Sequence, residues 1–185
     1  MNTAIHIAKQ IIERVIREGD AISSLKLQKL LYYSHGWTLA LEGDGLFSEY
    51  IEAWKDGPVH SVYREFSRFS ASGIINDDTL QLNNDPILDA VVMTYGGLLA
   101  SMLRNQTHRE SPWLDWYDGT MRQAIPHEAI RNFFLEQRDA PSFPIHQKFL
   151  DTWLGTKYGA VYIDTTHFGI TDEEYTQTRK ELGLA

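Results

Sequence analysis

Apolar residues recur every three to four positions in several stretches of the chain, which is the spacing of one face of an α-helix. A first helix is predicted to begin at a cap formed by Asn2 or Thr3 and to end at Gly19. A second helix is predicted from about Leu25 to Leu41, where a glycine-rich breaker follows. The first part of the chain therefore predicts a pair of long helices.

Later stretches predict shorter elements. Helical spacing returns in Val59 to Phe69, in Pro86 to Arg104 with a kink at Gly96-Gly97, after Pro112, and from Pro126 to about Arg138. Aromatic and β-branched residues in Phe47 to Lys55, closed by Asp56-Gly57-Pro58, predict a short strand or hairpin arm, and Ile74 to Leu82 predicts a turn and short strand. The predicted fold class is mainly α (α+β), a compact helical domain with a small β-hairpin or short sheet.

The composition changes character after Asp139-Ala140-Pro141. Apolar spacing between Ile145 and Leu154 predicts one more helix, and Thr171 with Glu174 forms a capping box for a last one. We therefore predict a domain over 1–140 and a C-terminal helical extension over 141–185 that packs on it.

The charge of the chain is uneven. The 185 residues carry a formal net charge of −8, but residues 1–41 hold five basic and three acidic side chains, whereas residues 42–100 hold three basic and ten acidic ones. An acidic middle argues against a broad phosphate-binding footprint and suits a basic protein partner, although a solvated acidic surface is the commoner explanation. Nucleic acid is therefore not an expected partner.

Two sequence features bear on location. The longest uncharged apolar stretch, Ala90 to Leu103, has 14 residues and is too short to span a bilayer. The segment from Met1 to Lys9 lacks the basic and apolar regions of a signal peptide. We expect a soluble, cytoplasmic protein that does not associate with membranes.

The residue types that carry most enzyme chemistry are absent or scattered. There is no cysteine, which excludes disulfides, thiolate metal sites and cysteine nucleophiles. His35, His60, His108 and His127 show no metal-ligand spacing, and no nucleophile elbow or phosphate-binding loop occurs. We predict no catalytic residue, metal or cofactor, and hence no enzyme; an acid–base pair assembled in space, such as His60 with a nearby carboxylate, stays open.

Three segments in a fixed order carry a family resemblance. They are Leu25-Lys26-Leu27-Gln28-Lys29-Leu30-Leu31-Tyr32-Tyr33 with Gly36-Trp37, then Glu52-Ala53-Trp54-Lys55-Asp56-Gly57-Pro58-Val59 with Tyr63, then Tyr95-Gly96 with Thr107-His108 and Pro112-Trp113. Together they resemble the Panacea domain, found in SocA-like antitoxins and phage-associated proteins. The resemblance covers roughly residues 5–135.

The resemblance implies an antitoxin that neutralises a cognate toxin by direct protein binding, the toxin being encoded by an adjacent gene. It also implies a setting in prophages or phage defence, and in some members delivery of the toxin to a protease or chaperone system. Two alternatives are a DNA-binding autorepressor and a hydrolase that uses His108. Whether the chain forms a homo-oligomer stays open.

Candidate contact residues come from the same segments. Lys26, Lys29 and Tyr33 are spaced to share one face of the second helix, either as a partner surface or as packing over apolar neighbours. The candidate partner-binding residues are Lys26, Lys29, Tyr33, Trp37, Trp54, Tyr63, His108 and Trp113. The candidate structural residues are Leu30, Gly57, Pro58, Thr107 and Pro112.

Two of these motifs have specific structural interpretations. Gly57-Pro58 is expected to form a rigid turn that seats Trp54 against the second helix. Thr107 or His108 is expected to hydrogen-bond the amides of the following turn.

Overall fold

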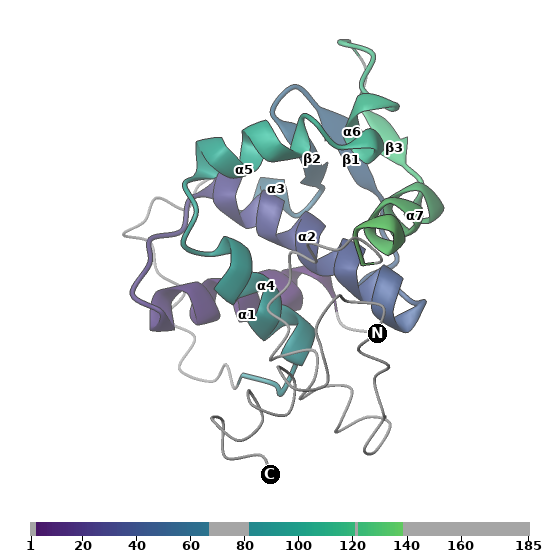
Figure 1. The fold of residues 1–185 in the computed structure, drawn as a ribbon. Helices are drawn as coiled ribbons and strands as arrows, with labels where there is room; N and C mark the ends of the chain where they lie inside the picture. Colours follow the sequence, from purple (N-terminus) through teal and green to yellow (C-terminus); the bar gives the residue numbers. More distant parts are fainter. Residues whose placement is uncertain (1–2, 67–81, 121, 139–185) are drawn as a thin grey trace, which may run out of the picture.

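The computed structural model describes residues 3–66, 82–120 and 122–138, which form several helices with a small sheet at one end (Figure 1). The helices are α1 (Ala4–Arg17), α2 (Ser24–Glu42), α3 (Tyr63–Phe66), α4 (Pro86–Tyr95), α5 (Ala100–Thr107), α6 (Ser111–Leu114) and α7 (His127–Arg138). The strands are β1 (Ile51–Trp54), β2 (Gly57–His60) and β3 (Gln123–Ile125). The predicted mainly helical α+β fold is confirmed. The elements expected in 74–81 and in 141–185 lie outside the described residues, so the division at residue 140 stays a prediction.

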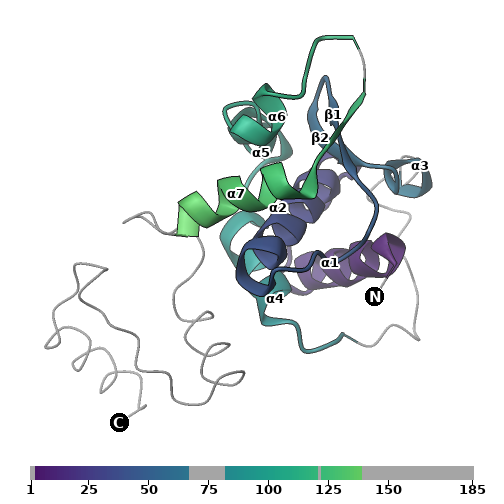
Figure 2. The ribbon, with the colours of Figure 1, turned by 90° about the vertical axis from the view of Figure 1, so that its right-hand side faces the viewer.

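Helix α2 is the centre of the fold. Every residue from Lys26 to Ala40 is buried, so the helix has no solvent-facing side over four turns. Figures 1 and 2 show why: α1 and α4 lie along one side of it, α7 along another, and α5 and β2 cover the remaining faces. A helix that is buried all round is not amphipathic, and its polar residues must find partners inside the protein.

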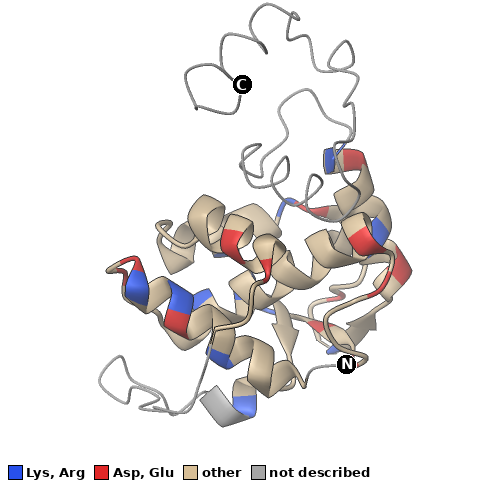
Figure 3. Ribbon diagram, turned by 90° about the horizontal axis from the view of Figure 1, so that it is seen from below, with Lys and Arg blue, Asp and Glu red and all other residues tan. Residues whose placement is uncertain are grey.

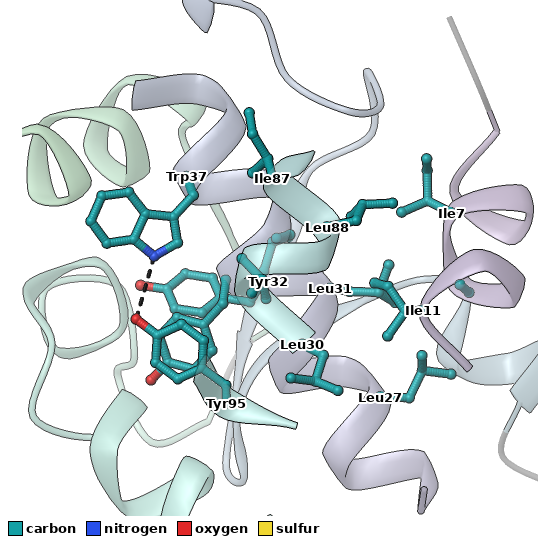
Figure 4. Packing of buried hydrophobic residues seen from close by; sticks show 14 of the residues in the cluster. Ile7, Ile11, Leu27, Leu30, Leu31, Tyr32, Trp37, Ile87, Leu88 and Tyr95 are labelled. Carbon is teal, nitrogen blue, oxygen red and sulfur yellow. Dashed lines mark hydrogen bonds between the residues drawn. The ribbon is translucent and has the colours of Figure 1, made fainter. Parts of the chain in front are cut away.

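The apolar core lies where α1 and α4 meet α2. Figure 4 shows Leu27, Leu30 and Leu31 of α2 facing Ile7 and Ile11 of α1 and Leu88 of α4, and each of these side chains is at most 2% exposed. Truncating a side chain of this kind to alanine costs about 2–5 kcal/mol, because a cavity is left behind. Leu30, the apolar member of the candidate structural set, therefore belongs to the core.

The ends of the first two helices follow their local sequence. Thr3 accepts a hydrogen bond from the His6 amide at the start of α1, and Ser23 accepts one from the Lys26 amide at the start of α2. Gly19 and Gly43, which follow the two helices, have positive φ values of 82° and 86°. The predicted starts and ends of both helices are confirmed.

A buried arginine fastens α1 to α4. The Arg14 side chain is 5% exposed, and its Nε donates to Asp89 Oδ1 at 2.6 Å. Its other nitrogens donate to Gln10 Oε1 at 2.8 Å and to the Asn83 carbonyl at 2.7 Å. Because every guanidinium nitrogen is hydrogen-bonded, the charge is tolerated beside the core.

The three strands form an antiparallel sheet in the order β2-β1-β3. Strand β1 pairs with β2 from Ile51 opposite His60 to Trp54 opposite Gly57, which makes a hairpin with a two-residue turn. On its other side β1 pairs with β3, with Glu52 opposite Ala124. The predicted hairpin is confirmed, but β3 was not predicted because three residues are too few to show an alternating pattern.

Two predicted helix ranges are wrong. The range Val59 to Phe69 begins as strand, because Val59 and His60 pair with β1, and of its described residues helix α3 covers Tyr63–Phe66. The range Pro86 to Arg104 is two helices bent by 104°. The kink expected at Gly96-Gly97 is therefore a complete break, and the second helix continues to Thr107.

Among the described residues no single helix is long and apolar enough to cross a membrane. Helices α4 and α5 reach that length and composition only together, across the 104° bend.

Candidate functional site

The three resembling segments meet in a cluster of buried polar and glycine residues, which we call the buried joint. It consists of Lys29, Tyr33, Gly57, Pro58, Thr107 and Glu110. It connects α2, the start of β2 and the turn between α5 and α6. Residues far apart in the sequence therefore share one location, and that location is inside the protein.

Lys29 is the central donor of the buried joint. Its side chain is fully buried and its Nζ donates to the Pro58 carbonyl at 2.9 Å. Burial lowers the pKa of Lys29 from 10.5 to about 7, an effect partly offset by the nearby carboxyls of Asp56 and Glu110. Near neutral pH this lysine is therefore close to losing its charge.

Glu110 is the acidic counterpart. The Tyr33 hydroxyl donates to Glu110 Oε1 at 2.9 Å, and the carboxyl is 7% exposed. Burial raises the pKa of Glu110 to about 7, although the hydrogen bond from Tyr33 and the charge of Lys29 act in the opposite direction. Burial also raises the pKa of Tyr33, so its phenol stays protonated and keeps donating.

Gly57 is required by space as well as by backbone angle. Its φ is +98°, and a Cβ built there would lie 2.7 Å from Lys29 Nζ and 2.8 Å from Thr107 Oγ1. Thr107 itself is fully buried, and its hydroxyl donates back to the Arg104 carbonyl at 2.9 Å. The expected hydrogen bond from the Thr107 side chain to the following turn is therefore not what the structure shows.

An aromatic cluster adjoins the buried joint. Tyr33 stacks on Tyr95 of α4 with ring centroids 4.2 Å apart and planes 5° apart, and Trp37 Nε1 donates to the Tyr95 hydroxyl at 3.4 Å (Figure 4). Phe134 of α7 contacts the Trp37 ring edge-on at 5.1 Å. A Cβ on Gly36 would lie 2.1 Å from Phe134 Cε2, so only glycine allows α7 to come this close.

Histidines that are scattered in the sequence meet on the other side of α2. His35 stacks on Phe47 at 4.2 Å, Phe47 meets His60 edge-on at 4.5 Å, and His127 of α7 meets His35 at 4.8 Å. Burial, together with His127 and His60, lowers the pKa of His35 to about 3, so its ring is neutral. No group of three or more potential metal ligands occurs among the described residues. The cluster is aromatic packing around the neutral ring of His35.

The outward side of the sheet carries a different set of residues, which we call the outer sheet face. It consists of Glu52, Trp54, Arg122 and Ala124. Ile51 and Ala53 point into the core and are fully buried, so the alternation of β1 turns Glu52 and Trp54 outward. The Arg122 guanidinium lies 3.8 Å from the Trp54 ring centroid, and Trp54 Nε1 donates to Glu52 Oε2 at 2.7 Å.

Rings from neighbouring elements border the outer sheet face. Tyr63 meets Trp54 edge-on at 5.6 Å. Trp113 of α6 donates from Nε1 to the Trp54 carbonyl at 2.8 Å, and stacks on His108 at 3.9 Å and on Tyr117 at 4.6 Å. Trp54 thus lies with Tyr63 and Arg122 outside the sheet, which differs from its expected seat against the second helix. The groups that reach α2 are Gly57 and Pro58.

The candidate partner-binding residues fall into two groups. Lys26, Lys29, Tyr33, Trp37 and Trp113 are buried, with exposed fractions of 8% or less. A partner cannot reach the first four in this conformation, because α2 is covered on every side. Trp54, Tyr63 and His108 are half-buried and reach the surface. The binding role of all eight stays a prediction.

Several residues of these clusters were not singled out from the sequence. Glu110 and Gln28 join the polar contacts around Lys29 and β2, and Arg122 covers Trp54. The position of Glu110 between Thr107-His108 and Pro112-Trp113 could have identified it from the sequence. Arg122 had no such signal, because nothing local shows that its strand pairs with β1.

Charges are distributed unevenly over the elements. Figure 3 shows acidic and basic positions interspersed along α1, where Glu13 and Arg17 pair at 2.9 Å. The loop from α2 to β1 holds only acidic charges, at Asp44 and Glu49, and Glu42 ends α2 just before it. The acidic middle predicted from the sequence thus includes the described loop that leads into the sheet.

Comparison with known proteins shows which family part of the chain resembles. The model of the family described as antitoxin SocA-like, Panacea domain, matches residues 27–114. Residues 27–114 are thus similar to the Panacea domain. The matched segment runs from α2 to α6, so it includes the buried joint and the hairpin, while α1, β3 and α7 lie outside it.

One curated relative supports the same assignment for part of the chain. Antitoxin SocA of Caulobacter vibrioides (strain NA1000 / CB15N) is 44% identical over 71 residues. The aligned region is 38% of this chain and 38% of that protein, so the similarity spans well under half of either. No solved structure matches the chain.

Proposed function

We propose that the chain is an antitoxin that neutralises a cognate toxin by binding it directly. The observation that carries this proposal is the Panacea domain over 27–114, together with 44% identity to Antitoxin SocA over 71 residues. The buried joint uses the signature residues to hold α2, the hairpin and the α5–α6 turn together. This supports a domain built to present a surface to another protein.

The proposed contact surface is the outer sheet face with its bordering rings. Trp54, Tyr63 and His108 are the candidate contact residues that reach the surface, and Arg122 lies against Trp54. Tryptophan, tyrosine and arginine are the residue types most enriched at interface hot spots. The buried candidates Lys29, Tyr33 and Trp37 act on binding only by holding this surface in place.

The first test is genetic and biochemical. The chain is co-expressed with the product of the adjacent gene, and growth and co-purification are measured. The proposal expects the neighbour to be toxic alone, growth to be restored by the chain, and a stable complex to be recovered. A neighbour whose toxicity persists, and which does not co-purify, would refute the proposed antitoxin function.

A second test addresses the contact surface. Trp54→Ala is expected to weaken the complex at least about tenfold, the equivalent of about 1.4 kcal/mol, because a hot-spot side chain is removed. Ile5→Ala is the matched control, since Ile5 is an exposed apolar side chain on α1, away from the sheet. Equal affinities for the two variants would argue against this surface.

Binding without catalysis is part of the proposal. The His108 ring lies flat against Trp113, and its Nε2 is buried without a hydrogen-bond partner among the described residues. A general base needs a proton donor or acceptor within reach. His108→Ala is therefore expected to leave any hydrolase activity of a preparation unchanged, and loss of such activity would favour the hydrolase alternative.

Delivery of the toxin to a protease is a further part of the proposal. It predicts that the toxin has a shorter lifetime in cells that contain the chain than in cells that lack it. A pulse-chase measurement of the toxin decides this, and an unchanged lifetime would limit the function to direct neutralisation.

A further inference from the structure

The two edges of the sheet are built differently. Strand β2 forms one edge, and α2 closes it: Lys29 Nζ donates to the Pro58 carbonyl at 2.9 Å, and the His60 amide donates to Gln28 Oε1 at 2.8 Å. Pro58 has no amide hydrogen to leave unpaired. On the outer side of β2, the Pro58 carbonyl and the His60 amide are thus both bonded to α2.

These contacts also fix which way each backbone group points. In an antiparallel pair, neighbouring residues turn their N–H and C=O alternately toward and away from the partner strand. Since Pro58 and His60 bond to α2, they point away from β1, and Val59 bonds to β1. Glu52, opposite Val59, therefore turns its backbone groups toward β2.

The same alternation carries across β1 to β3. Ile51 and Ala53 turn their backbone groups toward β3, where they meet Ile125 and Gln123. Ala124, between these two, must turn its N–H and C=O away from β1. Among the residues that the structure describes, no further strand lies beyond β3 in the sheet.

Ala124 lies at an open edge. It is exposed, and Figure 1 shows β3 on the outside of the sheet with no described helix or strand beyond it. An exposed strand with unpaired backbone groups is a template for another strand. The contrast with β2, where three devices close the edge, marks β3 as the side available to a partner.

We propose that the β3 edge binds an extended segment of the toxin, which adds to the sheet as a fourth strand through the Ala124 N–H and C=O. This inference rests on the proposed antitoxin function and names the contact by which it acts. Backbone pairing supplies affinity, and the outer sheet face supplies specificity. The Arg122 guanidinium lies over the Trp54 ring, and N–H groups of a guanidinium fit a carboxylate on the added segment.

The variant that tests this is Ala124→Pro, with Ala124→Val as the matched control. Proline removes the outward N–H and none of the hydrogen bonds to β1, and edge strands accept proline where the N–H faces outward. Valine keeps the N–H and suits a strand. Proline is expected to weaken toxin binding about tenfold or more and to lower growth rescue, while valine leaves both unchanged.

The outcomes separate this proposal from the antitoxin function. If the wild-type chain, Ala124→Pro and Ala124→Val all bind the toxin and rescue growth equally well, the proposed addition of a fourth strand is overturned. The antitoxin function would still stand in that case. The proposal would be supported if Ala124→Pro, but not Ala124→Val, weakens toxin binding while its circular dichroism and thermal unfolding stay unchanged.

Amide hydrogen exchange of the wild-type chain gives a second test that needs no variant. In the free chain the Ala124 amide is expected to exchange fast, while the Gln123 and Ile125 amides, which face β1, are protected. In the complex with the toxin, Ala124 is expected to become protected as well. An Ala124 amide that is already protected in the free chain, or that stays fast in the complex, would overturn the proposal.

Discussion

Lys29 shows at the scale of a single residue how a buried charge can be retained. Its ammonium group bonds the Pro58 carbonyl and so closes the outer edge of β2, and it also lies near Asp56 and Glu110. A buried ammonium without good partners costs several kcal/mol, which is why its pKa falls. A lysine kept at this cost has a structural task, and here that task is to connect α2 with the hairpin.

The ionisation of Lys29 and Glu110 predicts an unusual dependence of stability on pH. Glu110 has its pKa raised from 4.5 to about 7, so its contribution to stability is full below pH 4.5 and is lost as pH rises through 7. Lys29 has its pKa lowered from 10.5 to about 7, so the unfolded chain binds more protons between these values and stability rises with pH there.

Urea unfolding of three chains across this pH range checks the prediction. Glu110→Gln should remove the loss of stability between pH 4.5 and 7. The Oε1 of the glutamine side chain can still accept the hydrogen bond from the Tyr33 hydroxyl. Lys29→Met should remove the gain between pH 7 and 10.5. Profiles of both variants that run parallel to the wild type would contradict the pKa directions given above.

Gly57 makes a second prediction at this scale. Gly57→Ala should lower the free energy of unfolding by about 2 kcal/mol or more, from the positive φ and from the contacts with Lys29 Nζ and Thr107 Oγ1. Gly119→Ala is the matched control, because Gly119 has φ +86° and nothing within 4 Å of its Cβ position. Denaturant unfolding measures both, and equal losses would show that the close approach has no effect.

Among the elements, the packing of α7 on α2 depends on one glycine. Gly36→Ala would place a methyl group on the Phe134 ring, so we expect the free energy of unfolding to fall by about 1–3 kcal/mol. Phe134→Leu replaces the phenyl ring by a smaller side chain. It should lower the free energy of unfolding by less in the Gly36→Ala background than in the wild type. A double-mutant cycle measured by urea unfolding checks this, and additive losses would show that the two residues do not meet.

The break between α4 and α5 is also a property of elements. Gly96-Gly97 weakens the helix by roughly 1 kcal/mol per glycine relative to alanine, and the chain turns by 104° there. This turn lets α4 carry Tyr95 to the aromatic cluster while α5 carries Thr107 to the buried joint. One straight helix would not bring both residues to α2.

For the whole molecule, the net charge of −8 bears on how a partner arrives. If the toxin is basic, its association rate with the chain should fall as salt is raised, because long-range attraction is screened within about 8 Å at physiological ionic strength. The dissociation rate should change much less. Stopped-flow or surface-plasmon measurements over a salt series test this, and an association rate independent of salt would exclude electrostatic steering by the acidic surface.

The sequence by itself determined the helical class, the caps of α1 and α2, the hairpin and the Panacea signature. These rest on local spacing, on capping side chains and on glycine or proline at turns, which act within a few residues. The sequence also pointed to most of the buried joint, since Lys29, Gly57 and Thr107 were singled out, although Glu110 was not.

Only the tertiary structure decided which candidate residues are buried and which reach the surface. Lys26, Lys29 and Tyr33 lie on a helix that looks partly polar, but α1, α4, α5, α7 and β2 cover it on all sides. Burial depends on what packs against a residue, and no local pattern contains that information. For the same reason the pairing of β3 with β1, and with it the open edge at Ala124, appears only once the chain is folded.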